Sequence, residues 1–359
     1  MKSILFILPV ATQPRFSKRI DPFLLNDYKV TVATYERDYF ILNTLPENIE
    51  LINLGKVQHG NYLKRIPVLL RSLRTLILLS KVNDIVYIFS SDILLFFFLF
   101  IPKWKLIYEI GDIRVNDWNK IVSLIFSRLY RKALLKCSRI NVTSQGFKNY
   151  LIKEYYINNE DKICLLENKL STKNFSAYQE SFKKLILEKN KLFTIGIIGL
   201  LRYRNIIDFL QEYSKQCNHF VVKIYGDGPL LKEIQPFIDE HTVQYFGQFK
   251  YPDDIKKIYD NIDISFVMYD SDDLNVQLAL PNKLYESFCF KKPLIVSSNT
   301  YLAQKVRFHN IGFVWDQKNI ADLITFLNSE KFVDEYNDLE KSFSFVVQKD
   351  YLESSYDKD

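Results

Sequence analysis

One segment in the second half of the chain combines a cation and a carboxylate at the start of an expected helix. In residues 281–298 the helix begins at Pro281 or Asn282, which puts Lys283 in its first turn. A cation there opposes the helix dipole, so the placement makes sense where an anion binds. Glu286 lies on the same face and can accept hydrogen bonds from two ribose hydroxyls. This spacing suits a nucleotide diphosphate that carries a sugar.

Two arginines follow another expected strand. Residues 195–205 read as a strand, a tight turn at Gly199, then Arg202 and Arg204 before a helix. Arginine supplies forked donors that match a diphosphate, and a helix N-terminus attracts phosphate through its free amides. Each of these cations also has a plain structural alternative, as a solvated charge or an ordinary salt-bridge partner.

Glycine turns end two further strands. The strand 220–226 ends in a turn at Gly226, and a helix is expected from Pro229. This turn is either part of the phosphate site or purely structural. The residues after strand 243–247 are candidates for contact with a nucleobase: Gly247, Gln248 and Phe249.

Strand-like and helical patterns alternate along the whole chain. Apolar runs predict strands in both halves, at 3–9, 29–35, 84–90, 105–110, 139–144, 192–199, 220–226, 243–247, 263–269 and 292–298. Helical patterns fill the gaps between them, for example at 205–217, 229–240, 252–261 and 282–290. The order βαβα, given twice, predicts an α/β protein with two doubly wound parallel sheets. We expect a first domain over 1–170 and a second over 171–343, with a polar linker at 171–191. A C-terminal helix over 344–359 is expected to cross back to the first domain.

Composition and motifs exclude several classes. The four cysteines and four histidines are scattered, which argues against a disulfide scaffold and against a metal site. The first strand-to-helix turn, residues 9–19, has no G-x-G-x-x-G, and no P-loop motif occurs, so a dinucleotide dehydrogenase and a P-loop enzyme are disfavoured. The N-terminal apolar run 4–11 is short and predicts a buried strand in preference to a signal peptide.

Charge is distributed unevenly. The net charge is +6, and residues 1–170 contain 25 Lys and Arg against 15 Asp and Glu. Basic residues interleave with apolar ones in 62–81 and 120–139, which read either as surface helices with solvated cations or as a docking face for an anionic membrane. No nucleic-acid motif accompanies the charge. The apolar run 93–101 is too short to span a bilayer and predicts a buried helix.

Taken together, these motifs resemble the retaining glycosyltransferases of family four, which have the GT-B fold. Residues 281–297 resemble the family's donor-binding helix, with Glu286 at the position of the ribose-binding glutamate. Residues 225–229 and 199–205 resemble its second-domain turn and phosphate-binding turn. In the first half, 8–20 resembles the opening loop, with Pro-Arg in place of Gly-Gly. Residues 108–114, 142–151 and 165–169 resemble strand ends of the first domain.

The resemblance implies roles for individual residues. Arg202, Lys283 and Asp112 would serve catalysis, and Arg15, Glu109 and Asp112 would lie on the acceptor side. Further donor-binding positions are implied at Pro281, Asn282, Glu286, Leu278, Arg204, Gly199, Gly226, Gly247, Gln248 and Phe249. Asp112 and Arg15 have alternatives, as a helix-capping or turn aspartate and as a loop cation.

Two departures from the family pattern stand out. Leu278 occupies a position where many members carry a glutamate that contacts the transferred sugar, and Asn275 and Gln277 are the nearest polar residues. Gly111 precedes Asp112, where many members carry a histidine.

The resemblance implies a metal-independent enzyme without a cofactor that transfers a sugar with retention of configuration. The donor would be a nucleotide-sugar, with uridine favoured as the base, and the acceptor a saccharide or a lipid-linked one. Such an enzyme would build a surface polysaccharide, such as a capsule, O-antigen or lipopolysaccharide, and lie in the cytoplasm against the cell membrane. The alternatives are a non-catalytic nucleotide-sugar-binding scaffold and a nucleotide-sugar epimerase.

Overall fold

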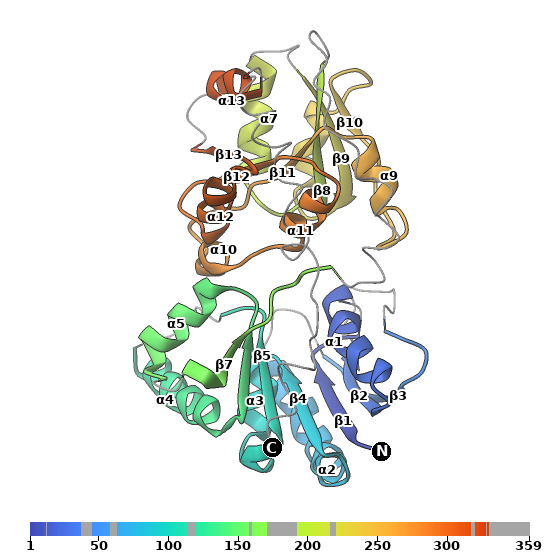
Figure 1. Cartoon of the computed structure of the whole chain (residues 1–359), viewed down its shortest axis with the longest axis vertical. Coiled ribbons are helices and arrows are strands. Elements are labelled where there is room, and N and C mark those ends of the chain that lie inside the picture. The colour runs from blue at the N-terminus through green and yellow to red at the C-terminus, as the bar shows by residue number, and fades with distance from the viewer. Residues whose placement is uncertain are drawn as a thin grey trace. The chain divides into compact units, whose positions relative to one another are not determined.

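The computed structural model describes residues 1–11, 13–36, 45–57, 63–113, 120–157, 160–170, 192–215, 220–316, 320–327 and 329. They fall into two compact units, of which the first contains Met1–Glu167 and the second begins at Asn168 (Figure 1). The linker expected at 171–191 and the C-terminal helix expected at 344–359 lie outside the described residues.

The first unit is built on a parallel sheet with the strand order β3-β2-β1-β4-β5-β6-β7. Its strands are β1 Ser3–Leu8, β2 Lys29–Glu36, β3 Glu50–Lys56, β4 Ile85–Phe89, β5 Leu106–Ile110, β6 Arg139–Val142 and β7 Ile163–Leu165. Its helices are α1 Pro14–Leu25, α2 Ile66–Val82, α3 Ser91–Phe97, α4 Lys120–Lys136 and α5 Gln145–Tyr155. The strand order reverses between β1 and β4, and such a switch point is where α/β sheets bind ligands.

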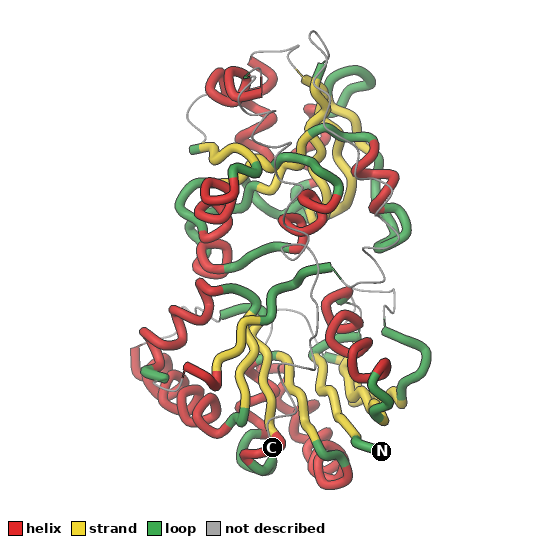
Figure 2. Tube along the Cα trace, viewed as in Figure 1, coloured by secondary structure: helices red, strands yellow, loops and turns green. Residues whose placement is uncertain are grey.

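The second unit repeats this plan of a sheet with flanking helices (Figure 2). Its strand order is β10-β9-β8-β11-β12-β13. Its strands are β8 Phe193–Leu200, β9 Phe220–Asp227, β10 Val243–Tyr245, β11 Ile264–Val267, β12 Leu294–Ser297 and β13 Gly312–Trp315. Its helices are α7 Asn205–Lys215, α8 Leu231–Ile234, α9 Ile255–Asp260, α10 Leu274–Leu278, α11 Asn282–Cys289, α12 Tyr301–His309 and α13 Ile320–Leu327. Here the order reverses between β8 and β11. The predicted α/β fold with two Rossmann-like parallel sheets is therefore confirmed.

Burial explains why the central strands are easy to read from the sequence. β1 is fully buried from Ile4 to Leu8 because helices cover both faces of a parallel sheet. On one face, Phe16, Ile20 and Phe23 of α1 pack into the core formed by β1, β2, β4 and β5. Helices α3, α4 and α5 connect β4, β5, β6 and β7, which follow one another in a single direction along the sheet. Because such connections are right-handed, the three helices lie together on the other face.

The apolar run 93–101 is mostly a core element, and Phe98 and Ile101 near its end are buried too. Ile93, Leu94 and Phe97 of α3 are buried, as predicted, whereas Leu99 and Phe100 beyond the helix are exposed. No described helix combines the length and apolar character needed to cross a membrane.

The helix expected over 229–240 is wrong in length and in start. α8 contains only Leu231–Ile234 and is followed by a 3₁₀ turn, Gln235–Phe237. Pro229 lies in the turn that precedes α8. Pro236 lacks an amide hydrogen and clashes with the preceding turn, so the α-helical pattern cannot continue through it.

Candidate functional site

The start of α11 forms the centre of the candidate site. The helix begins at Asn282, as predicted, and Pro281 at its N-cap provides no side-chain hydrogen bond to its amides. Lys283 and Glu286 lie on one face, and Nζ of Lys283 lies 2.7 Å from Oε2 of Glu286. The lysine side chain is 14% exposed and the glutamate side chain 1%. The two residues singled out by their spacing therefore form an ion pair beside an uncapped helix N-terminus.

Tyr259 of α9 donates a hydrogen bond to the Glu286 carboxylate. Its hydroxyl lies 3.3 Å from Oε2 of Glu286 and 3.3 Å from Oγ of Ser287. Burial, and secondarily the Glu286 charge, raises the pKa of Tyr259 well above its usual value, so the hydroxyl stays protonated and can donate. The sequence analysis missed Tyr259, because nothing in the pattern of an amphipathic helix marks which tyrosine meets a carboxylate.

Three predicted glycines bring the ends of β8, β9 and β10 together. A Cβ built on Gly226 would lie 1.8 Å from the carbonyl oxygen of Gly199, and the Gly226 amide donates to the Gly247 carbonyl at 2.7 Å. Gly199 and Gly226 have φ of +117° and +134°, which side chains rarely adopt. A Cβ on Gly199 would face Cε of Lys283 at 4.0 Å. The phosphate-turn glycine therefore lies next to the lysine of α11.

The loop after β10 contributes an aromatic wall. Nζ of Lys283 lies 6.0 Å from the centroid of the Phe249 ring, which places Phe249 at the site. Gln248 donates from Nε2 to Asp227 at 2.8 Å, and this bond, with that from the Gly228 amide, lowers the pKa of the Asp227 carboxyl. The Gln248 amide nitrogen is thus engaged by Asp227.

A carboxylate already occupies the N-terminus of α7. Oδ2 of Asp270 accepts from the Arg204 amide and Oδ1 from the Asn205 amide, each at 3.1 Å. These are the amides that the sequence analysis assigned to phosphate, and Asp270 satisfies them as a capping residue from the end of β11. The first amides of α11, by contrast, have no side-chain cap.

The two predicted arginines point to different partners. Arg202 stacks over the Tyr203 ring with its Cζ 4.7 Å from the centroid, and its positive charge lowers the pKa of Tyr269, which burial raises above the usual value. The Tyr203 ring packs in turn on the Tyr269 ring, with centroids 4.6 Å apart. Arg204 instead bonds Glu233 at 2.6 Å on an exposed surface, which is the salt-bridge alternative.

The residues near Leu278 are mostly engaged within their own loop. Leu278 ends α10, and its side chain has no group that could bond a sugar hydroxyl. Gln277 donates from Nε2 to the Ser271 carbonyl at 2.8 Å. Oδ1 of Asn282 is buried and has no hydrogen-bond partner among the described residues, so it is an acceptor available at the start of α11.

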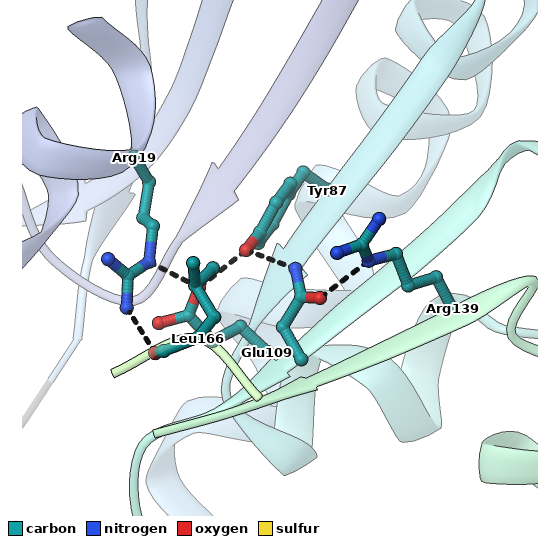
Figure 3. Close-up of polar contacts among 6 residues, drawn as sticks. Arg19, Tyr87, Glu109, Arg139 and Leu166 are labelled. Atoms are coloured by element: carbon teal, nitrogen blue, oxygen red, sulfur yellow. Dashed lines mark hydrogen bonds and ion pairs between the residues drawn. The ribbon is translucent and has the colours of Figure 1, made fainter. Parts of the chain in front are cut away.

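In the first unit, Glu109 lies in a buried polar network (Figure 3). Its Oε2 accepts from Nε of Arg19 at 2.9 Å and from the Tyr87 hydroxyl, and Arg19 also donates to the Leu166 carbonyl at 2.9 Å. Asn141 donates to the Tyr87 hydroxyl at 2.7 Å and accepts from Arg139 at 2.8 Å. The network ties α1 to β4, β5 and β6 beneath the ends of the strands. Glu109 therefore has a structural role in the first unit.

The other two predicted acceptor-side residues lie at the end of β5. The guanidinium of Arg15 packs against Gly111, and Asp112 beside it is exposed. Residues 114–119 that follow lie outside the described part of the chain. Within that part, no cluster of His, Cys, Asp and Glu side chains could hold a metal ion.

Known proteins resemble the chain in fold. No family model matches it. The succinoglycan biosynthesis protein ExoL of Rhizobium meliloti (strain 1021) is 22% identical over 352 residues, covering 91% of this chain and 84% of ExoL. Anabaena HepE, solved with UDP and glucose, superposes with a TM-score of 0.64 at 13% identity, covering 94% and 93% of the two chains. WaaG, a glycosyltransferase of lipopolysaccharide biosynthesis, gives a TM-score of 0.63 at 11% identity, covering 96% of each chain. The two units thus have the fold of GT-B glycosyltransferases.

Proposed function

We propose that the chain is a glycosyltransferase that uses a nucleotide-diphosphate sugar, with a UDP-sugar as the favoured donor. The observation that carries the proposal is the Lys283–Glu286 pair at the uncapped N-terminus of α11. A fold shared with HepE, a protein that was solved with UDP and glucose, supports it.

In this proposal two kinds of protein group bind different parts of the donor. Glu286 accepts the ribose hydroxyls, while Lys283 and the α11 amides receive the diphosphate. Arg202, which follows β8, is the second cation that we propose for the diphosphate. Arg204 and the α7 amides take no part, because Glu233 and Asp270 already bond them.

We propose transfer with retention of configuration, and without a metal ion. The acceptor hydroxyl attacks the face that the nucleotide leaves, and a diphosphate oxygen takes its proton, so no protein nucleophile is needed. Catalysis then depends on positioning and on stabilising the charge that grows on the diphosphate. Lys283 and Arg202 are the residues proposed to supply that stabilisation.

A transfer assay tests the proposal. Purified protein would be incubated with UDP-, GDP- and CMP-sugars and a lipid-linked saccharide extract, with EDTA present, and the product linkage read by proton NMR. Transfer from one UDP-sugar with the donor's anomeric configuration is expected. Tight UDP binding without turnover on any acceptor would favour the non-catalytic scaffold, and an inverted product would refute retention.

We further propose that the acceptor is lipid-linked, in surface polysaccharide synthesis, and that the first unit docks on an anionic membrane from the cytoplasmic side. α4 contains five Lys and Arg and no acidic residue. Large apolar side chains of α4 nonetheless face solvent: Ile121 71%, Val122 43%, Leu124 51%, Ile125 53% and Leu129 45% exposed. Nζ of Lys136 donates to the Leu99 carbonyl at 3.0 Å, which brings exposed Leu99 and Phe100 to the C-terminal end of the same helix. Exposed apolar groups with flanking cations fit a headgroup boundary.

Vesicle sedimentation tests the membrane surface. The Ile121→Ser/Ile125→Ser variant is expected to bind vesicles of phosphatidylcholine and phosphatidylglycerol about thirtyfold more weakly, because burying each of the two side chains is worth more than about 1 kcal/mol. Phe308→Ser is the matched control, since Phe308 is 82% exposed in the second unit. Equal losses in both variants, or none in either, would contradict docking through α4.

A further inference from the structure

Helix α1 presents two arginines one turn apart to the end of β5. Arg19 meets Glu109, and Arg15 meets Gly111, two positions further along the chain. Alternate residues of a strand face the same side, so Glu109 and Gly111 present the same side to α1. The first arginine has a carboxylate opposite it, whereas the second has a residue without a side chain.

The Arg15 guanidinium fills the space that a side chain at position 111 would take. A Cβ built on Gly111 would lie 1.8 Å from Nη1 of Arg15 and 2.8 Å from its Cζ. The glycine thus fixes the guanidinium against the backbone at the carboxyl end of the sheet. Both positions are departures from the family pattern, 96 residues apart in the sequence, and the structure puts them in contact.

No described residue supplies a counter-charge to Arg15. Its Nε is buried without a hydrogen-bond partner among the described residues, and none of the described carboxylates lies within ion-pair distance of it. The first turn of α1 contains no acidic residue, and Gln13 at its N-cap makes no side-chain capping bond. Arg19, by contrast, bonds both Glu109 and Leu166. Of the two arginines, only Arg15 therefore has a guanidinium that is held in place without an anion.

We infer that Arg15 is a binding residue for a phosphate group of a substrate, placed at the start of α1 by Gly111. A planar guanidinium offers parallel donors that match phosphate oxygens. Two sources share this chemistry, the diphosphate of a nucleotide-sugar and a phosphate on a lipid-linked acceptor. The inference requires only an anionic substrate, so it stands apart from the proposed role of α11.

The experiment uses inorganic phosphate as the probe, with affinity measured from ³¹P NMR line widths. The background is Lys283→Gln, so that phosphate at α11 does not contribute. Arg15→Gln is expected to lower phosphate affinity about tenfold or more. Gly111→Ala keeps the charge but displaces the guanidinium, and it is expected to weaken binding several-fold. Gly111 does not have a positive φ, so its backbone accepts alanine.

The double variant separates this inference from a general loss of structure. If Gly111 acts only through Arg15, Gly111→Ala should have no further effect once Arg15 is glutamine. Unchanged phosphate affinity in Arg15→Gln would overturn the inference, and so would a full effect of Gly111→Ala in the double variant.

UDP titrations on the otherwise wild-type chain distinguish the two sources. A parallel loss of UDP affinity in Arg15→Gln would assign Arg15 to the donor diphosphate, and unchanged UDP affinity would assign it to an acceptor phosphate. The effect of Glu286→Gln on UDP binding tests the proposed role of α11 and not the role of Arg15. Whether that variant loses UDP binding or keeps it, the inference about Arg15 depends only on phosphate affinity.

Discussion

Replacing Glu286 by glutamine is expected to lower the affinity for UDP by about a hundredfold. The carboxylate is nearly fully buried and is the proposed acceptor for two ribose hydroxyls, and each hydrogen bond to a charged group is worth about 1.5–3 kcal/mol. An amide offers one oxygen, and its nitrogen would face the Lys283 ammonium at the distance where the carboxylate now pairs with it. Isothermal titration with UDP measures the loss.

Glu233→Gln provides the matched control for this change. Glu233 also pairs with a basic residue of the second unit, Arg204, but on an exposed surface. Its replacement is expected to leave UDP affinity within about twofold, because exposed ion pairs contribute little. If both variants bind UDP like the wild type, the donor does not bind at α11, and the proposed division of roles fails.

The second large effect is on stability. Glu109→Ala is expected to destabilise the first unit by about 3–5 kcal/mol, because it leaves the buried guanidinium of Arg19 without its carboxylate. The Tyr87 hydroxyl loses its acceptor at the same time. For a unit of this size, the midpoint of thermal unfolding should fall by about 10 °C in calorimetry.

A double variant separates the cost of a lone charge from the value of the pair. Glu109→Leu with Arg19→Met removes both charges and is expected to recover most of the lost stability, since a buried pair is often replaceable by apolar groups. Glu233→Ala, which breaks an exposed pair, should change stability by less than about 1 kcal/mol. A Glu109→Ala midpoint equal to that of Glu233→Ala would contradict a structural role for Glu109.

The sequence predicted the central strands and the edge strand β10, and it missed the edge strands β3, β7 and β13. β1, β4 and β12 are continuous apolar runs because both of their faces are buried. β3 lies at an edge of its sheet and is polar and largely exposed, and β7 has only three residues, so neither produces a recognisable run.

The site was predictable where its residues are close in sequence. The spacing of Lys283 and Glu286 predicted that they share a helix face, and the structure shows them as an ion pair on that face. The capping of α7 by Asp270 could not be predicted, because Asp270 is some 65 residues from the start of α7 in the chain. The two come together only because β11 pairs with β8. For the same reason the spacing of Arg15 and Gly111 gave no sign of their contact.

The Lys283–Glu286 pair also affects whether the second unit can fold without a ligand. A buried carboxylate without a cation would destabilise the ligand-free protein, and the folded state would then depend on a bound ligand for its stability. Here the chain supplies the cation three residues away, on the same helix. The second unit is therefore expected to fold before the proposed donor binds, and to remain folded when that donor is scarce.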